Sequence, residues 1–216
     1  MGLPKGDSAM AYICSLTDMK GKVRIELDNG LKYVLKKKDL PDAPLHENDE
    51  VDEKEFHHFV LIHQYPDALN TAVAMLARRA CSRKEIADKL ASRGFCDEVT
   101  ALVLYKLEKE RLLNDQDFSD QWTRYRSGSH YGPNRIYREL RMKGIDEDTA
   151  REALSSIDKN DTSQKALDLA LKTCRKSSPG EDPRKIRQRV LRSLVSRGFD
   201  WDTAREACDK AMGEHE

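Results

Sequence analysis

A short motif that occurs three times constrains this chain more than any other feature of its sequence. In each copy a leucine is followed by three residues, the last of them cationic, and then by glycine and a large apolar residue. The copies run Leu90–Phe95, Leu140–Ile145 and Leu194–Phe199. This order is typical of a Schellman C-cap, in which glycine takes the left-handed conformation and the apolar residue packs back on the leucine. The motif therefore predicts structural caps at Gly94, Gly144 and Gly198.

Signals for the start of a helix stand on both sides of each copy. Ser82 and Glu85 form a capping box before the first copy, and Pro133 and Pro183 take first-turn positions before the other two. Acidic residues after each glycine suit the first turn of a following helix, because they face the positive end of its dipole. Each copy therefore predicts a basic helix, a glycine corner and a second helix.

A further helical pattern precedes each basic helix. These lead helices are predicted at Asp67–Ala80, Asp117–Ser127 and Thr162–Lys176. The apolar face of the first is predicted at Leu69, Val73, Leu76 and Ala80. With the two helices of each motif, the lead helices give three units of three helices each.

The lead helix of the second unit carries aromatic residues at helical spacing. Phe118, Trp122 and Tyr125 could form a platform for stacking bases, but their spacing favours a core stripe. Asp115 is the predicted N-cap of this helix, and Asp161 is the predicted N-cap of the third lead helix.

The N-terminal region shows the alternation of β-strands. The alternating apolar residues are Val23, Ile25 and Leu27, then Leu31, Tyr33 and Leu35. A two-residue Asn-Gly turn would place these two rows on opposite faces of the hairpin. A three-residue loop with left-handed Gly30 pairs Leu27 with Leu31 and Ile25 with Tyr33, so both rows share one face. We therefore predict the three-residue loop.

Other short elements complete the N-terminal region. Tyr12–Leu16 is a candidate strand, Leu40–Asn48 is a predicted loop, and Asp52 with Glu55 can cap a short helix. The apolar residues of that helix are Phe56, Phe59 and Ile62. Its histidines, His57, His58 and His63, have no further ligand at a suitable spacing, so we expect surface residues and no metal site.

These patterns predict a mostly α protein of three tandem three-helix repeats in an elongated curved array, with a small N-terminal β-hairpin segment. The expected regions are 1–66 for the hairpin segment and short helix, 67–114 for the first repeat, 115–157 for the second and 158–216 for the third. The composition agrees, since 35% of the 216 residues are charged and 38% are apolar, which suits small modules better than one large core.

The charge balance and the cysteine content limit the classes of function that the sequence supports. Lys and Arg number 38 and so do Asp and Glu, so the total charge gives no argument for nucleic-acid binding. The five cysteines include no CxxC pair and indicate reduced thiols. No leader and no apolar stretch of membrane-spanning length is visible, so we expect a cytoplasmic protein.

Basic residues gather on particular helices and on one loop, where they could attract phosphate or an acidic protein surface. A solvated helix face is the alternative interpretation. The binding candidates are Arg78, Arg79, Arg83, Lys84, Arg124, Arg126, His130, Tyr131, Arg135, Arg138, Arg141, Lys143, Lys185, Arg189 and Arg192. No phosphate loop, nucleophile elbow or HExxH motif accompanies them, so we expect no catalytic residues, no cofactor and no enzyme activity.

Several of these motifs occur together in a known order. They are Ala77–Glu85 with Leu90, Gly94 and Phe95, then Leu112–Asp115, Phe118 and Trp122, then Tyr131–Pro133, Ile136, Glu139, Leu140, Lys143–Ile145 and Ala150–Leu154. In this order the chain resembles the RecX regulators of the bacterial RecA recombinase, over about residues 65–210.

The resemblance implies a non-enzymatic helical protein that acts by binding. Members of that family bind the RecA filament on single-stranded DNA, lie in its groove, and inhibit strand exchange, ATP hydrolysis and coprotease activity. This places them in the control of recombination, DNA repair and the SOS response. The implied partner is therefore the RecA filament, with weaker direct DNA binding, and we expect a monomer. The alternative is a helical-repeat module that binds nucleic acid without a recombinase partner.

Overall fold

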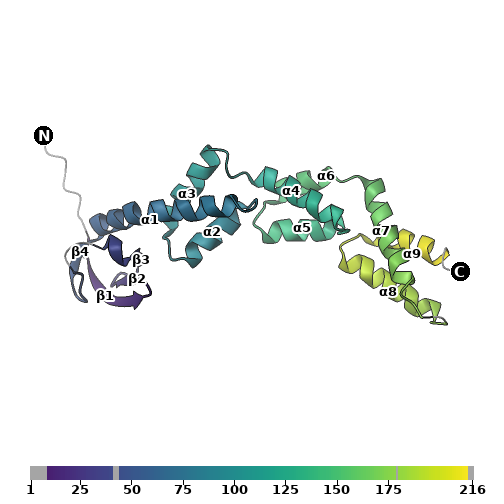
Figure 1. The fold of residues 1–216 in the computed structure, drawn as a ribbon, viewed down its shortest axis with the longest axis horizontal. Helices are drawn as coiled ribbons and strands as arrows, with labels where there is room; N and C mark the ends of the chain where they lie inside the picture. Colours follow the sequence, from purple (N-terminus) through teal and green to yellow (C-terminus); the bar gives the residue numbers. More distant parts are fainter. Residues whose placement is uncertain (1–8, 41–43, 179, 214–216) are drawn as a thin grey trace. The chain divides into compact units, whose positions relative to one another are not determined.

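The protein is described by a computed structural model over residues 9–40, 44–178 and 180–213 (Figure 1). It divides into two compact units, Met1–Leu113 and Asn114–Glu216. The first unit holds a β-sheet and three helices, and the second holds six helices within the described residues. The predicted mostly helical fold with a small N-terminal strand region is therefore confirmed. Residues 1–8 of the predicted N-terminal region and residues 41–43 of the predicted loop lie outside the described residues.

The sheet is antiparallel and larger than the predicted hairpin. Its strands are β1 (Met10–Met19), β2 (Lys22–Leu27), β3 (Lys32–Lys36) and β4 (Glu50–Asp52), in the order β3-β2-β1-β4. The predicted three-residue loop is confirmed, because the Leu27 N–H donates to the Leu31 carbonyl at 2.9 Å and Ile25 pairs with Tyr33. Strand β4 was not predicted, because its three residues are too short for an alternation to be read.

Helix α1 (Glu53–Leu76) joins two helices that the sequence suggested were separate. It continues through Pro66, so no structural boundary separates residues 66 and 67. The buried residues recur every fourth position, at Phe56, Val60, Gln64, Ala68 and Ala72. The predicted apolar face of the lead helix was wrong at Val73, which is 43% exposed, and Ile62 of the predicted short helix is 55% exposed. Small alanines and one glutamine take the buried stripe, and a search for large apolar residues overlooks them.

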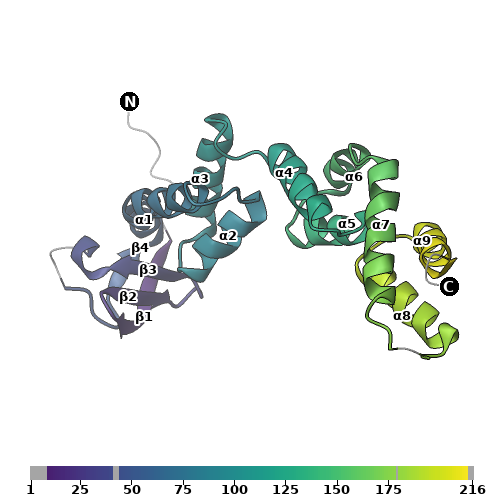
Figure 2. The same ribbon diagram turned by 45° about the vertical axis from the view of Figure 1, so that its right-hand side comes forward.

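One end of α1 covers the sheet and the other belongs to the first three-helix repeat (Figures 1 and 2). The remaining helices of the first unit are α2 (Arg83–Ser92) and α3 (Asp97–Lys109). The helices of the second unit are α4 (Asp115–Gly128), α5 (Pro133–Met142), α6 (Glu147–Ser155), α7 (Lys159–Cys174), α8 (Pro183–Ser196) and α9 (Trp201–Gly213). Each repeat encloses its own apolar core.

All three predicted glycine corners are present. Gly94, Gly144 and Gly198 have φ angles of 85°, 83° and 90°. In each corner the N–H of the apolar residue donates to the carbonyl of the predicted leucine, over 3.1–3.3 Å. This is the 6→1 hydrogen bond of the Schellman motif, so the corner assignment is confirmed.

Two predicted helix starts were wrong. Asn114, rather than Asp115, caps α4 by accepting from the Gln116 N–H at 2.9 Å. Asp158, rather than Asp161, caps α7, which begins about one turn earlier than expected. The aromatic stripe of α4 was also wrong in part, since Phe118 is buried but Tyr125 is 65% exposed. Thr123 and Ser119 take buried positions on that helix instead.

Candidate interaction surface of the basic helices

The second unit joins two basic helices end to end, α8 and α5. The Gly132 N–H donates to the Arg197 carbonyl at 2.9 Å, and the Asn134 N–H donates to the Gly198 carbonyl at 3.1 Å. Helix α5 has no side-chain N-cap, because its N-cap residue is Gly132. Carbonyls at the end of α8 therefore satisfy N–H groups at the start of α5. The negative end of one helix dipole meets the positive end of the next, which is a favourable alignment.

The backbones approach so closely at this α8–α5 junction that side chains are excluded. A Cβ atom at Gly132 would collide with the backbone of Gly198 and Phe199, and a Cβ atom at Gly198 would collide with Arg135. The two glycines are therefore a steric requirement of the junction. As a result the second and third repeats hold their basic helices in one fixed register.

A carboxylate next to the junction gathers several of the candidate residues. Glu139 accepts hydrogen bonds from Arg126 Nε at 2.6 Å, Arg135 Nε at 3.0 Å and Trp122 Nε1 at 3.2 Å. Burial raises the pKa of Glu139, but the hydrogen bonds from both arginines outweigh burial and the net pKa lies below its ordinary value. The Glu139 hydrogen bond also raises the pKa of Arg126.

The ring of Tyr131 lies among three guanidinium groups. The guanidinium carbons of Arg126, Arg135 and Arg197 lie 3.9, 4.3 and 5.0 Å from its centroid, within the range of cation–π attraction. The Arg126 side chain is only 16% exposed. Arg126, Arg135 and Tyr131 thus have defined intramolecular partners, and we assign them to positioning the α8–α5 junction.

Other cations of α5 and its end remain exposed. The Arg138 Nε donates to the Asn134 carbonyl of its own helix at 3.2 Å, and Arg141 donates to the Ile145 carbonyl at 2.7 Å. Neither has a carboxylate partner in the part of the chain that the structure describes. Lys143 differs, because its ammonium lies 4.2 Å from the Trp122 ring centroid. Arg138 and Arg141 are therefore exposed cations of α5 that form no ion pair with another described residue.

Helix α8 also carries some cations that form ion pairs and others that are exposed without one. Arg187 pairs with Asp209, and Arg189 pairs with Glu181 at 2.7 Å. Lys185 and Arg192 are exposed and form no ion pair among residues 9–40, 44–178 and 180–213, although the charge of Lys185 contributes to lowering the pKa of Glu181. We define the basic face of unit 2 as Arg138, Arg141, Lys185 and Arg192.

Most binding candidates predicted in the first unit form ion pairs. Arg79 pairs with Glu85 at 3.0 Å, Arg83 with Glu108 at 2.9 Å and Lys84 with Asp88 at 2.5 Å. Arg78 is exposed. Arg124 on α4 is also exposed, and its Nε donates to the Asp120 carbonyl at 3.3 Å. Among the binding candidates predicted in the first unit, Arg78 is therefore the one that forms no ion pair with another described residue.

The predicted loop at His130 borders a pocket of 300 Å³ in the second unit. His130 has a φ of 58°, in the left-handed region that non-glycine residues seldom adopt. Lys172 and Arg197 line the same pocket, with Asp168 on α7. Sequence reasoning missed Lys172, because only the packing of α7 beside the loop brings it there.

Within the described residues no three His, Cys, Asp or Glu side chains gather closely enough to hold a metal ion. No helix of the described chain has the length and apolar character needed to span a membrane.

Family models match each of the three repeats. The first three-helix domain of RecX matches residues 68–107, the second matches 114–154 and the third matches 161–208. The sheet and the first half of α1 lie outside all three matches. The matched segments follow one another in the family order.

Curated relatives and solved structures agree with these matches. Regulatory protein RecX of Bacillus velezensis is 34% identical over 71% of this chain and 60% of its own length, and that of Bacillus subtilis is 30% identical over 92% and 72%. RecX of Prosthecochloris aestuarii is 36% identical over 67% of this chain and 93% of its own. A crystal structure of regulatory protein RecX has a TM-score of 0.64 and 25% identity, covering 92% of this chain and 99% of that one. RecX from Lactobacillus salivarius has a TM-score of 0.59 and 26% identity, covering 68% and 96%.

Proposed function

Because the chain belongs to the RecX family of regulatory proteins, we propose that it regulates the RecA recombinase by binding the RecA filament on single-stranded DNA. Its expected action is inhibition of strand exchange and of ATP hydrolysis. It acts by binding and not by catalysis, as a cytoplasmic monomer. Recombination and the DNA-repair response are the processes it would control.

The observation that carries the proposal is the basic face of unit 2. Its four cations form no ion pair among the described residues, and they lie on two helices joined end to end by hydrogen bonds. Uncompensated cations attract phosphate or acidic side chains more strongly than cations already paired. A fixed register suits a partner that repeats, as a filament does, because no entropy is then lost in aligning the two helices.

The alternative function is a nucleic-acid-binding module with no recombinase partner. The same cations favour it, since exposed arginines bind phosphates of any single strand. The equal numbers of basic and acidic residues favour the filament, because a chain of zero net charge has little long-range attraction for naked DNA.

The test is a charge reversal on the basic face. We expect the double variant Arg138→Glu and Arg141→Glu to keep its helicity, since both residues are exposed. Inhibition of RecA ATP turnover on single-stranded DNA should require about tenfold more of the variant, which corresponds to about 1.4 kcal/mol of binding. Arg135 is left unchanged in this variant because it pairs with Glu139.

The matched control reverses the same amount of charge elsewhere in unit 2. Arg151→Glu with Arg205→Glu alters exposed residues of α6 and α9, and this variant should inhibit as the wild type does. Equal inhibition by the α5 variant and the wild type would remove the basic face from the mechanism. A second assay adds free single-stranded DNA: relief of inhibition in proportion to that DNA would favour the nucleic-acid module.

A further inference from the structure

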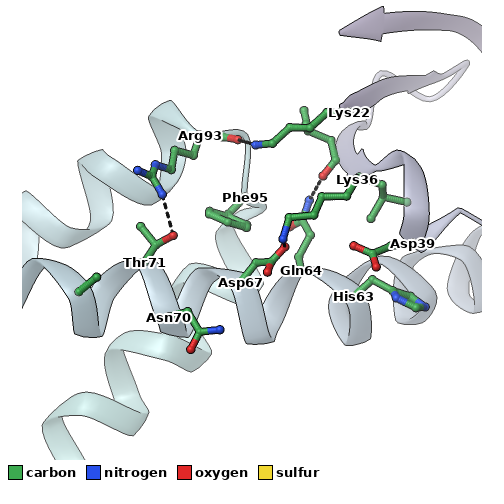
Figure 3. A pocket seen from close by; sticks show the side chains of 13 residues that line it. Lys22, Lys36, Asp39, His63, Gln64, Asp67, Asn70, Thr71, Arg93 and Phe95 are labelled. Carbon is green, nitrogen blue, oxygen red and sulfur yellow. Dashed lines mark hydrogen bonds and ion pairs between the residues drawn. The ribbon is translucent and has the colours of Figure 1, made fainter. Parts of the chain in front are cut away.

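The first unit contains a polar pocket of 330 Å³ where the sheet meets the glycine corner of α2 (Figure 3). Strands β2 and β3 supply one wall, α1 supplies another, and the end of α2 closes it. The family matches begin at residue 68, so the strands lie outside the regions they describe. The pocket therefore exists only because the N-terminal sheet is added to the repeat.

A buried glutamine holds these walls together. Gln64 is 2% exposed, and its Nε2 donates to the carbonyls of Val34 at 2.9 Å and Gly94 at 3.3 Å. Its Oε1 accepts from the Cys96 N–H at 2.9 Å. One side chain thus bonds to β3, to the corner and to the start of α3. The pocket is preformed, because the hydrogen bonds of a buried side chain hold its walls together.

Cationic side chains converge on the pocket from two sides. In Figure 3, Lys22 and Lys36 extend from the sheet, and the Arg93 side chain extends from the end of α2 toward Thr71. The Lys22 ammonium donates to the Arg93 carbonyl at 3.4 Å, and the Arg93 guanidinium donates to Thr71 Oγ1 at 2.9 Å. Neither cation has a carboxylate partner in the described parts of the chain, whereas Lys36 pairs with Asp67. Lysine has three donors and arginine five, so Lys22 and Arg93 keep donors to spare.

The remaining lining adds an aromatic surface and neutral polar groups. Phe95 lines the pocket, with the Lys22 ammonium 5.9 Å from its ring centroid. Asn70 and Thr71 on α1 offer an amide and a hydroxyl. Three cations against Asp39 and Asp67 leave a balance of 3 − 2 = +1 when His63 is neutral.

We propose that this pocket binds a nucleotide through its phosphate group. A phosphate has three acceptor oxygens that point in different directions, which suits an ammonium and a guanidinium arriving from two walls. The base then lies against Phe95, and its edge meets Asn70. The volume lies at the lower end of the range for small-ligand sites, which fits one nucleotide unit. The unit could belong to a free mononucleotide or to a single strand, and the chemistry of recognition is the same.

The experiment measures binding to the full chain without any recombinase, so its outcome is independent of the proposed regulation of RecA. Inorganic phosphate, deoxyadenosine monophosphate and a fluorescent oligothymidylate are titrated against wild type, Lys22→Gln and Arg93→Gln. We expect each variant to weaken binding about tenfold, because each removes one charged contact. Lys89→Gln, on the same helix as Arg93 but outside the pocket, should bind as wild type does.

The probes distinguish the two sources of the phosphate. Weakening for the mononucleotide and the oligonucleotide alike supports a site for free nucleotides, and weakening for the oligonucleotide alone supports a site for a single strand. Equal affinity of wild type and both variants for every probe overturns the proposal, as does the absence of binding. Circular dichroism checks the fold, and Lys22→Gln alone suffices if Arg93→Gln is unstable.

Discussion

The glycine corners at Gly94 and Gly198 have the same backbone and opposite surroundings. At Gly94 the nearest atoms to an added Cβ belong to the Val34 side chain of the sheet, at 2.7 Å. At Gly198 the nearest atoms include the backbone of Arg135 at the start of α5. The first corner thus faces a side chain whose methyl groups can rotate, although its Cβ at 2.9 Å cannot, and the second faces a helix end that cannot move without breaking hydrogen bonds.

The polar side chains beside the two corners also differ, since one is neutral and the other is charged. Neutral Gln64 binds the Gly94 corner to the sheet, whereas ionised Glu139 lies beside the α8–α5 junction and binds Arg126 and Arg135. One sequence motif therefore supports two kinds of docking. The element that packs against the glycine determines which kind of docking occurs. Because glycine has no side chain, either a side chain or a backbone segment can approach it closely.

The largest expected effect is that of Gly198→Ala. The substitution combines strain at positive φ with a collision against backbone, which together should lower the free energy of unfolding by about 3 kcal/mol. Denaturant unfolding followed by circular dichroism measures the loss. Hydrogen exchange should also rise at the start of α5, because the Gly198 carbonyl accepts the Asn134 N–H.

Gly132→Ala separates the collision from the strain. Gly132 has a φ of −78°, which alanine adopts freely, so any large cost must come from contact with Gly198 and Phe199. We expect a loss of about 2 kcal/mol, against a few tenths for the exchange of glycine for alanine at an ordinary N-cap. A loss within that smaller range would show that the two repeats do not interlock as described.

Structural features that depend on residues close together in the sequence could be predicted, whereas features that depend on tertiary contacts could not. The corners at Gly94, Gly144 and Gly198 follow from residues five apart, so their hydrogen bonds were foreseen. The junction between α8 and α5 joins Gly132 to Arg197, and no local pattern marks two glycines 66 positions apart as partners (198 − 132 = 66). The continuity of α1 was missed because Pro66 reads as a boundary, although a helix tolerates proline when tertiary packing compensates.

The candidate binding residues show the same limit. The sequence places arginines on α5 at three-residue spacing and treats them alike. In the structure Arg135 turns to Glu139 and Tyr131, while Arg138 and Arg141 stay exposed. Glu139 and the ring of Tyr131, in the loop before α5, determine which arginine makes intramolecular contacts. Composition and spacing cannot separate these roles, because the deciding contacts are tertiary.

Gly94→Ala should have a smaller effect than Gly198→Ala. The strain at a φ of 85° remains, but the Val34 methyl group at 2.7 Å can rotate away, so we expect a loss of about 2 kcal/mol. In a Val34→Ala background the same substitution should cost less, about 1–2 kcal/mol, because the methyl contact at 2.7 Å is gone and the contact with the Cβ at 2.9 Å remains beside the strain. A double-mutant cycle by denaturant unfolding measures the difference. Equal costs for Gly94→Ala and Gly198→Ala would contradict the contrast between the corners.

The smallest effect, and the one that depends on pH, is that of Glu139→Gln. Glutamine keeps an acceptor oxygen but loses the charge that binds Arg126 and Arg135, so we expect a loss of about 1 kcal/mol at neutral pH. The pKa of Glu139 is lowered in the folded chain, so the stabilisation is fully present above the ordinary value of 4.5. It disappears as pH falls through the lower folded value.

Wild type and the Glu139→Gln variant should therefore converge in stability between pH 4.5 and more acidic conditions, although they differ at pH 7. Denaturant midpoints measured along that pH series provide the check. The corresponding variant at the Gly94 corner is Gln64→Glu, which places a carboxyl where the wild type has a buried amide. The carbonyls of Val34 and Gly94, which accept from Gln64 Nε2, then face a carboxylate oxygen. The cost of this substitution should be largest at neutral pH and should shrink on acidification, since the protonated carboxyl can donate as the amide does. A constant gap between wild type and Glu139→Gln at every pH would mean that Glu139 stabilises the junction by its shape and not by its charge.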